Sequence, residues 1–341
     1  MTAAAGRQGP AVVGTVDEIE RAATRRERVA GTLQRGGAFV ALVVVTLLAS
    51  LIFGTRFASV DNFLNILEAS SFLGLVSVGM TFVIIGGGID LSVGSLLALS
   101  AVLAAFGSQY GTAAAILLPL GVCGLIGLAN GLLIARARMA AFIVTLCALL
   151  FARGLAFAVS DEGNLIFHIP DGLAVSWLGQ GSIVGIRVPI VIAGIAFLIG
   201  WLVLNRTRYG VAVTAIGGNE DAARLMGLPI ARVKTAMYLA SGLLAGLAGL
   251  LVAARSSSGQ STIGVGLELQ AIAAVVIGGT LLTGGSGSIL GTLAGVLLLN
   301  VINNVINQVG TLSSYFQQVV SGVFLIAVVL IQRYLSREQR L

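Results

Sequence analysis

The chain has few charged residues and few of the side chains that metal sites and active sites use. Of its 341 residues, 10% are charged and 6% are aromatic, with one histidine, one lysine and two cysteines. An ordinary soluble domain carries about a quarter charged residues, so this composition excludes that class. His168 has no second ligand nearby in the sequence, and Cys123 and Cys147 lie in apolar runs without metal-ligand spacing. No metal site is expected.

Motifs for nucleotide binding and catalysis are also missing. A P-loop requires GxxxxGK[ST], but the one lysine, Lys234, lies in ARVKTA, so this chain is not expected to bind ATP in that way. The glycine-rich segment GGSGSILG at 284–291 has no strand before it, which favours a helix break or close helix packing over a dinucleotide loop. No Ser, His and Asp set or carboxylate pair suggests catalysis. We therefore expect neither an enzyme nor a cofactor.

Long apolar segments recur along most of the chain. Hydrophobic residues make up 57% of the sequence. The apolar runs are roughly 16 to 25 residues long, close to what a helix needs to cross about 30 Å of hydrocarbon. They predict an all-α, polytopic membrane bundle of about ten transmembrane helices. The predicted ranges are 38–54, 66–86, 90–107, 112–135, 140–159, 187–204, 234–254, 268–283, 286–303 and 316–332.

Basic residues set the predicted orientation. An even number of helices puts both termini on one side of the membrane. All lysines and arginines except Arg56, Arg153, Arg187 and Arg255 then fall on that side, which the positive-inside rule makes the cytosol. Because these residues are scattered over membrane-proximal loops, nucleic acid is not an expected partner.

The same orientation gives the predicted domains. A cytosolic tail at 1–37 precedes a transmembrane domain at 38–333, which contains a cytosolic loop at 205–233, and a second cytosolic tail follows at 334–341. The first tail holds DEIERAATRRER and no apolar block, so no cleaved signal peptide is expected.

A polar segment rich in glycine interrupts one of the most apolar parts of the chain. Residues 86–95 read GGGIDLSVGS, and Asp90 or Ser92 can accept hydrogen bonds from amides that start the next helix. Irregular backbone at membrane depth must face protein or a water-filled cavity, and such breaks often line transport pathways. Asp90 is either a plain N-cap near the cytosolic end of a hairpin or part of a pathway, and the two roles are compatible. The candidate pathway residues are Gly86, Gly87, Gly88, Asp90, Ser92, Gly94 and Ser95.

A second segment repeats this pattern loosely. VVIGGTLLTGGSGSILG at 275–291 follows the same order as VIIGGGIDLSVGSLLAL at 83–99: an apolar block, two glycines, a polar break, Gly-Ser and a further apolar block. The pattern indicates a duplicated helical hairpin, although a glycine-rich composition can produce the same order by itself.

The cytosolic loop contains a short predicted helix at 219–227. Asn219 is a good N-cap, Glu220 and Asp221 suit the positive end of a helix, and Gly227 followed by Pro229 ends it. The segment is either a connector or a helix that docks onto a cytosolic partner. The candidate docking residues are Asn219, Glu220, Asp221, Ala222, Ala223 and Gly227.

Four segments resemble the permease subunits of bacterial ABC importers for sugars, the ribose, xylose, arabinose and galactofuranose group. They are GMTFVIIGGGIDLSVGS (79–95), AIGGNEDAARLMGL (215–228), LELQAIAAVVIGGTLLTGG (267–285) and GTLSSYFQQVVSGVFLIAVVLIQR (310–333). The last two look most like a permease of the galactofuranose importer. The tail at 1–37 has no counterpart in this resemblance.

The resemblance implies a non-catalytic, multi-pass subunit in a bacterial inner membrane. It implies a second permease, identical or paralogous, a periplasmic sugar-binding protein, and a cytosolic ABC ATPase that hydrolyses ATP. The family's coupling loop has the form EAAxxxG, which Asp221, Ala222, Ala223 and Gly227 match with Asp in place of Glu. Either carboxylate suits a helix start. The sugar itself is not indicated.

Two other classes of transporter stay open. An ion-coupled secondary transporter needs intramembrane carboxylates, and Asp90 is the one acid placed clearly inside the predicted bundle, with Glu68 and Glu268 near outer helix ends. An ABC permease for branched-chain amino acids or nucleosides is a closer alternative, against which the IDLSVGS segment argues through the resemblance.

Overall fold

Helices make up most of the structure. The computed structural model describes residues 37–309 and residues 319, 322, 323 and 326. The predicted helix at 316–332 falls outside the continuous part of this description. Apart from Gly37, the predicted tails at 1–37 and 334–341 fall outside it altogether.

Seven of the described helices are long and apolar enough to cross a membrane. They are Gly37–Arg56, α2 (Val60–Ile85), α4 (Thr112–Ala135), α5 (Ala141–Val159), α7 (Val188–Arg206), α10 (Ile230–Ser256) and α12 (Ile289–Val309). The first ends in the 3-10 turn η1 (Gly54–Arg56). The prediction of an all-α, polytopic membrane bundle is confirmed at this level, whereas the number ten is not.

Two further apolar helices are shorter, and one of them corrects a prediction. These helices are α3 (Val93–Ser108) and α11 (Leu267–Ile277). We predicted a transmembrane helix at 268–283, but α11 ends at Ile277 because the glycine-rich segment that follows turns the backbone, with φ of +87° at Gly279. Its 11 residues span about 16 Å, roughly half of the hydrocarbon thickness.

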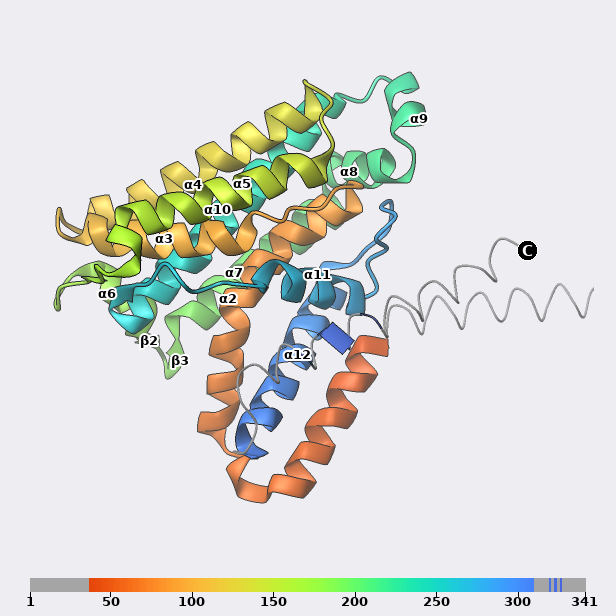
Figure 1. Cartoon of the computed structure of the whole chain (residues 1–341). Helices are drawn as coiled ribbons and strands as arrows, with labels where there is room; N and C mark the ends of the chain where they lie inside the picture. The colour runs from red at the N-terminus through yellow and green to blue at the C-terminus, as the bar shows by residue number, and fades with distance from the viewer. Residues whose placement is uncertain (1–36, 310–318, 320–321, 324–325, 327–341) are drawn as a thin grey trace, which may run out of the picture.

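The connecting elements gather at opposite ends of the bundle. At one end lie α8 (Arg208–Gly218) and α9 (Glu220–Leu225), and at the other lie α6 (Ala174–Gln180) and the hairpin of β2 (Ser182–Ile183) and β3 (Ile186–Arg187) (Figure 1). The 3-10 turn η2 (Asp161–Gly163) and the antiparallel pair of β1 (Phe167–His168) and β4 (Ser258–Gly259) complete the described elements. The sequence analysis did not predict α8, which lies at the same end of the bundle as α9.

Helix α10 lies at the centre of the bundle and packs mainly against α2, α3 and α4. Small residues permit this close approach: a Cβ on Gly127 of α4 would lie 2.5 Å from the carbonyl oxygen of Tyr238 in α10. Of the 18-residue apolar stretch of α2, 89% is buried within the protein, whereas 11% of the corresponding stretch of Gly37–Arg56 is buried. The break after α2 therefore starts from the interior of the protein, whereas the first helix exposes an apolar surface suited to lipid.

Candidate functional site

The break after α2 folds back into the bundle, and Asp90 lies at its buried tip. The Asp90 side chain is fully buried, as are Ser92 and Ser241. One Asp90 carboxylate oxygen accepts hydrogen bonds from the Ser92 amide at 3.0 Å and the Ser92 hydroxyl at 2.6 Å. The other accepts a bond from the Ser241 hydroxyl of α10 at 2.7 Å. Asp90 thus joins the break to the central helix.

This geometry differs from a plain N-cap. Asp90 accepts the amide of Ser92, the residue before α3, and Ser92 gives α3 no side-chain cap. The Ser92 hydroxyl instead donates to Asp90 and accepts a bond from the Asn130 amide of α4 at 3.3 Å. Asp90 therefore satisfies a local amide, and Asp90 and Ser92 together link the start of α3 to α10 and α4.

Asp90 lies deep along the axis of the bundle. Its partner Ser241 is near the middle of the 27-residue helix α10, about 16 Å from Ile230 at a rise of about 1.5 Å per residue. Asp90 therefore lies well away from either end of α10. A buried carboxylate at this depth is a candidate for function, and its three hydrogen bonds offset part of the cost of burial.

The glycines of the segment allow this path. Gly87 adopts the left-handed conformation at φ +80°. Gly94 lies so close to the loop before α11 that a Cβ there would be 2.4 Å from the Gly264 carbonyl oxygen. Gly86 and Gly88 face Met237 and Tyr238 of α10, and Ser95 is buried in the first turn of α3.

The two glycine-rich breaks that resemble each other in sequence meet in the structure. The Gly285 amide donates to the Ile85 carbonyl oxygen at 2.8 Å, which joins the break between α11 and α12 to the end of α2. Gly217 of α8 lies between them: a Cβ there would overlap the Ile85 carbonyl oxygen and lie 2.7 Å from the Gly285 amide nitrogen. We call Ile85, Gly87, Gly217, Gly284 and Gly285 the glycine junction.

The predicted short helix is present as α9. Asn219 caps it by accepting the Ala222 amide at 2.9 Å, and Gly227 follows it at φ +77°. Ala223, one of the candidate docking residues, is 0% exposed and packs within this chain beside residues such as Val213 and Ile230, so its side chain is not on the surface of α9. The outer face carries Ala222, Asp221 and two large apolar side chains that sequence reasoning missed, Leu225 and Met226, which are 91% and 68% exposed.

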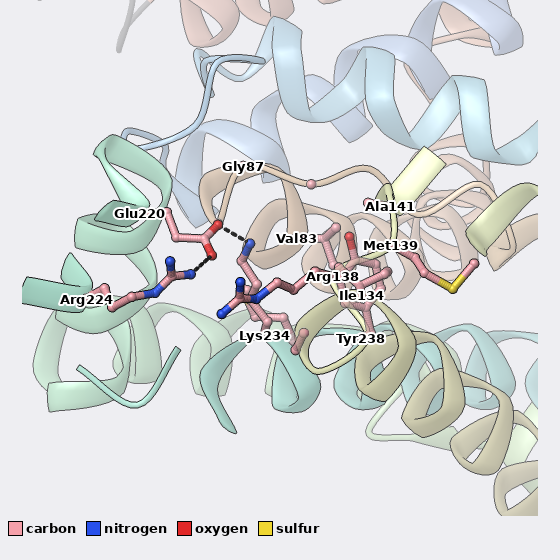
Figure 2. Close-up of a pocket in the computed structure, with 14 residues that line it drawn as sticks. Val83, Gly87, Ile134, Arg138, Met139, Ala141, Glu220, Arg224, Lys234 and Tyr238 are labelled. Carbon is pink, nitrogen blue, oxygen red and sulfur yellow. Dashed lines mark hydrogen bonds and ion pairs between the residues drawn. The ribbon is translucent and has the colours of Figure 1, made fainter. Parts of the chain in front are cut away.

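Glu220 attaches α9 to α10. Its carboxylate accepts a bond from Lys234 at 2.5 Å and from Arg224 at 3.1 Å (Figure 2). Arg224 also lies 3.6 Å from Asp221. Since Asn219 directly follows α8, whose last turn holds Gly217, α9 is attached both to α10 and to the glycine junction.

A buried ion cluster lies at the opposite end of the bundle. Glu68 of α2 is 3% exposed and pairs with Arg187, at the start of α7, and with the Arg255 Nε at 2.7 Å near the end of α10. Arg187 also donates to Asn65 at 2.8 Å. The sequence placed these groups on one side of the membrane, but the pairing depends on three distant helix ends.

Arg153 fixes the loop that precedes α11. Its guanidinium donates to the Ser261 carbonyl oxygen at 2.8 Å and to the Ile263 carbonyl oxygen at 2.7 Å.

Two of the three acids considered for ion coupling have partners within the chain. Glu68 is paired with two arginines, and Asp90 accepts hydrogen bonds from two serine hydroxyls.

Comparison with known proteins identifies the family. Residues 62–329 match the family described as branched-chain amino acid transport system / permease component. The chain belongs to this permease family. The match covers both helix breaks and α9, so the features described above lie within the family's own domain.

Several curated relatives of this permease cover nearly the whole chain. The ribose import permease protein RbsC of Bacillus subtilis is 41% identical over 320 residues, which is 93% of this chain and 98% of the relative. The inner membrane ABC transporter permease protein YjfF of Escherichia coli is 42% identical over 290 residues, 82% of this chain and 86% of the relative. The L-arabinose transport system permease protein AraH of Escherichia coli is 37% identical over 308 residues, 87% of this chain and 90% of the relative. No solved structure gives a significant match.

Proposed function

We propose that this permease is the membrane-spanning subunit of an ATP-driven, binding-protein-dependent sugar importer and forms its translocation path. The observation that carries the proposal is the 41% identity to a ribose import permease over 93% of this chain. The family description names branched-chain amino acids, but the relatives compared above are named for ribose and arabinose or as an inner membrane ABC permease. The proposed location is a bacterial inner membrane.

The end of the bundle that carries α8 and α9 is proposed to face the cytosol and dock onto an ABC ATPase. Two features support this. Arg138, Arg224 and Lys234 line one pocket at that end, as expected for the cytosolic side. In addition, α9 exposes Leu225 and Met226, and an exposed apolar face on a capped helix outside the bilayer is suited to a protein contact.

The glycine junction is proposed to carry motion from the ATPase to the path. A shift of α9 moves Gly217, which has no free space between the carbonyl of Ile85 and the amide of Gly285. Packed interfaces of this kind switch between arrangements and do not deform continuously. Both breaks would then move with α8, and Asp90 would carry the change to the centre of α10 through Ser241.

The sugar and the second permease are further parts of the proposal. The two segments that look most like a galactofuranose permease favour that sugar and a paralogous second subunit. The identities of 41% and 42% to relatives with different names do not separate ribose from other sugars.

Reconstituted transport tests the proposal. The permease, co-expressed with an ABC ATPase and a sugar-binding protein, is placed in proteoliposomes with ATP inside or outside. We expect uptake of a monosaccharide that requires ATP on the side of α9 and persists when ionophores collapse ion gradients. Uptake that follows a proton or sodium gradient without ATP would show an ion-coupled transporter, and uptake of leucine but of no sugar would show an amino acid permease.

A further inference from the structure

A polar pocket of about 250 Å³ lies at the α9 end of the bundle, between α9, the end of α2, the start of α10 and the link between α4 and α5. Its volume is below the roughly 300 to 1,000 Å³ of most sites for drug-sized ligands, so it suits a small ligand. Figure 2 shows Arg138 and Lys234 extending into the same part of this pocket, beside Glu220.

The charges in the pocket favour an anion. Arg138, Arg224 and Lys234 face a single carboxylate, Glu220, so the lining has a surplus of positive charge. Glu220 is already bonded to Lys234 and Arg224. Arg138 makes no hydrogen bond or ion pair with the described residues. It also has φ of +54°, a costly conformation for a residue other than glycine.

Further hydrogen-bond donors belong to residues that line the same pocket. Tyr238 lines the pocket, and its hydroxyl is buried beside Gly88, another lining residue, with no hydrogen-bond partner among the described residues. An unpartnered buried hydroxyl costs free energy that a ligand can recover. Helix α5 begins at Ala141 in the pocket wall, and no side chain caps this N-terminus. The first amides of a helix, together with its dipole, favour an anion there.

We infer that this pocket binds a phosphate group, held by Arg138, the Tyr238 hydroxyl, Lys234 and the start of α5. A phosphate has enough oxygens for an arginine fork, a hydroxyl, an ammonium group and backbone amides together, and its charge matches the surplus in the lining. A monocarboxylate has fewer acceptor positions and less charge. The phosphate belongs either to a small soluble phosphomonoester or to the headgroup of an anionic lipid.

Occupancy would connect elements that transport must move. The ligand would touch α9 through the Glu220 and Lys234 pair, and it would touch the break directly, since Gly86, Gly87 and Gly88 line the same pocket. A bound phosphate would therefore fix α9 against α2 and α10. It would act as a regulatory ligand on the side where ATP is used. Phosphate binding itself does not depend on the identity of the transported solute.

The test uses the full-length chain in lipid nanodiscs, with inorganic phosphate and glycerol phosphate as probes and calorimetric titration as the measurement. One set of nanodiscs contains phosphatidylcholine alone, and the other contains phosphatidylglycerol as well. We expect saturable phosphate binding in the first set. If soluble phosphate is the ligand, binding persists in the second set. If a lipid headgroup is the ligand, phosphatidylglycerol abolishes phosphate binding and co-purifies with the protein.

Matched variants assign the binding to the pocket. Arg138→Gln should weaken phosphate or phosphatidylglycerol binding about tenfold, because it removes a charge-assisted hydrogen bond. Arg136→Gln, which changes an exposed arginine of the same link that does not line the pocket, should leave binding unchanged. Tyr238→Phe should weaken binding without lowering the melting temperature of the ligand-free protein, because its hydroxyl has no partner to lose.

Three results would overturn the inference. They are the absence of saturable binding of either probe and of phosphatidylglycerol, equal weakening by Arg136→Gln and Arg138→Gln, and displacement of bound phosphate by a neutral monosaccharide at equal concentration.

Discussion

The Asp90 carboxylate accepts a hydrogen bond of 2.7 Å from the Ser241 hydroxyl, across 151 positions of the chain. This bond joins a broken segment, whose own backbone hydrogen bonds are incomplete, to the middle of the most central helix. The bond makes the position of the break depend on α10. In the proposed transporter, any movement of α10 relative to α2 has to break or carry this contact.

Replacing Asp90 separates its hydrogen bonds from its charge. Asn has one carbonyl oxygen for the Ser92 amide and an NH₂ group that can donate to Ser241, so Asp90→Asn should retain most sugar uptake. Asp90→Leu leaves buried donors without partners, at about 1 to 3 kcal/mol each, and should lower expression or uptake strongly. Uptake by proteoliposomes, normalised to the amount of inserted protein, measures both. Equal loss in the two variants at normal insertion would show that the charge itself is required.

The glycine junction offers a matched pair of substitutions. A Cβ on Gly217 would overlap the Ile85 carbonyl oxygen, whereas the nearest atom to a Cβ on Gly218 is 4.0 Å away. Gly217→Ala should therefore cost at least about 1 to 3 kcal/mol through overpacking and reduce ATP-driven uptake, while Gly218→Ala should be close to wild type. Because Gly217→Ala changes the junction and leaves the outer face of α9 intact, ATPase co-purification should persist. The idea fails if Gly217→Ala transports at the wild-type rate.

The outer face of α9 should hold the ATPase through Leu225 and Met226. Leu225→Asp places a charge on a side chain that is 91% exposed, so it should weaken ATPase co-purification and abolish uptake without reducing insertion. Ala223→Trp should instead reduce the amount of folded protein, because Ala223 is buried within this chain. Val211→Asp serves as the control, because it places the same charge on another exposed apolar side chain, on α8. Full ATPase binding by Leu225→Asp would make α9 a connector.

Cysteine labelling tests the proposed orientation. In a background where the exposed Cys147 and the buried Cys123 are both replaced by Ala, Asp171→Cys and Asp221→Cys place single thiols at opposite ends of the bundle. A membrane-impermeant thiol reagent should label Asp171→Cys in intact spheroplasts and should label Asp221→Cys only after the membrane is opened. Labelling in the opposite order would reverse the assigned sides.

The Glu68 cluster should contribute to stability more than to transport specificity. Glu68→Gln removes the carboxylate that Arg187 and Arg255 share, so it should lower the free energy of unfolding by roughly 1 to 3 kcal/mol. This loss is smaller than that expected for a fully buried pair, because both arginines are partly exposed. Thermal unfolding in detergent measures the loss. Arg255→Gln, which leaves the Arg187 pair in place, should have a smaller effect. An unchanged melting temperature for Glu68→Gln would contradict this role.

Much of this fold followed from the sequence because its causes are local. The range predicted for α4, 112–135, matches the structure, and the bounds of α5 differ by one residue at its start, since apolar length fixes a membrane helix. Asn219 capped α9 as predicted, because the cap depends on residues within one turn. The glycines at 278 and 279 marked a break, but not where it began, so the predicted end of α11 lay six residues beyond its end in the structure.

Tertiary structure alone decided which of these local features meet. The sequence by itself determined the class of the protein, the membrane helices and the presence of a polar break, since each depends on composition or on a few consecutive residues. It contained no signal for the depth of Asp90, the burial of Ala223 or the contact of Gly217 with Ile85 and Gly285, which depend on how distant helices pack. Backbone groups left free by a helix break must find partners somewhere in the bundle. Only the packed structure shows that the Ile85 carbonyl accepts a bond from the Gly285 amide of the second break, and the Ile89 carbonyl one from the Thr145 hydroxyl of α5.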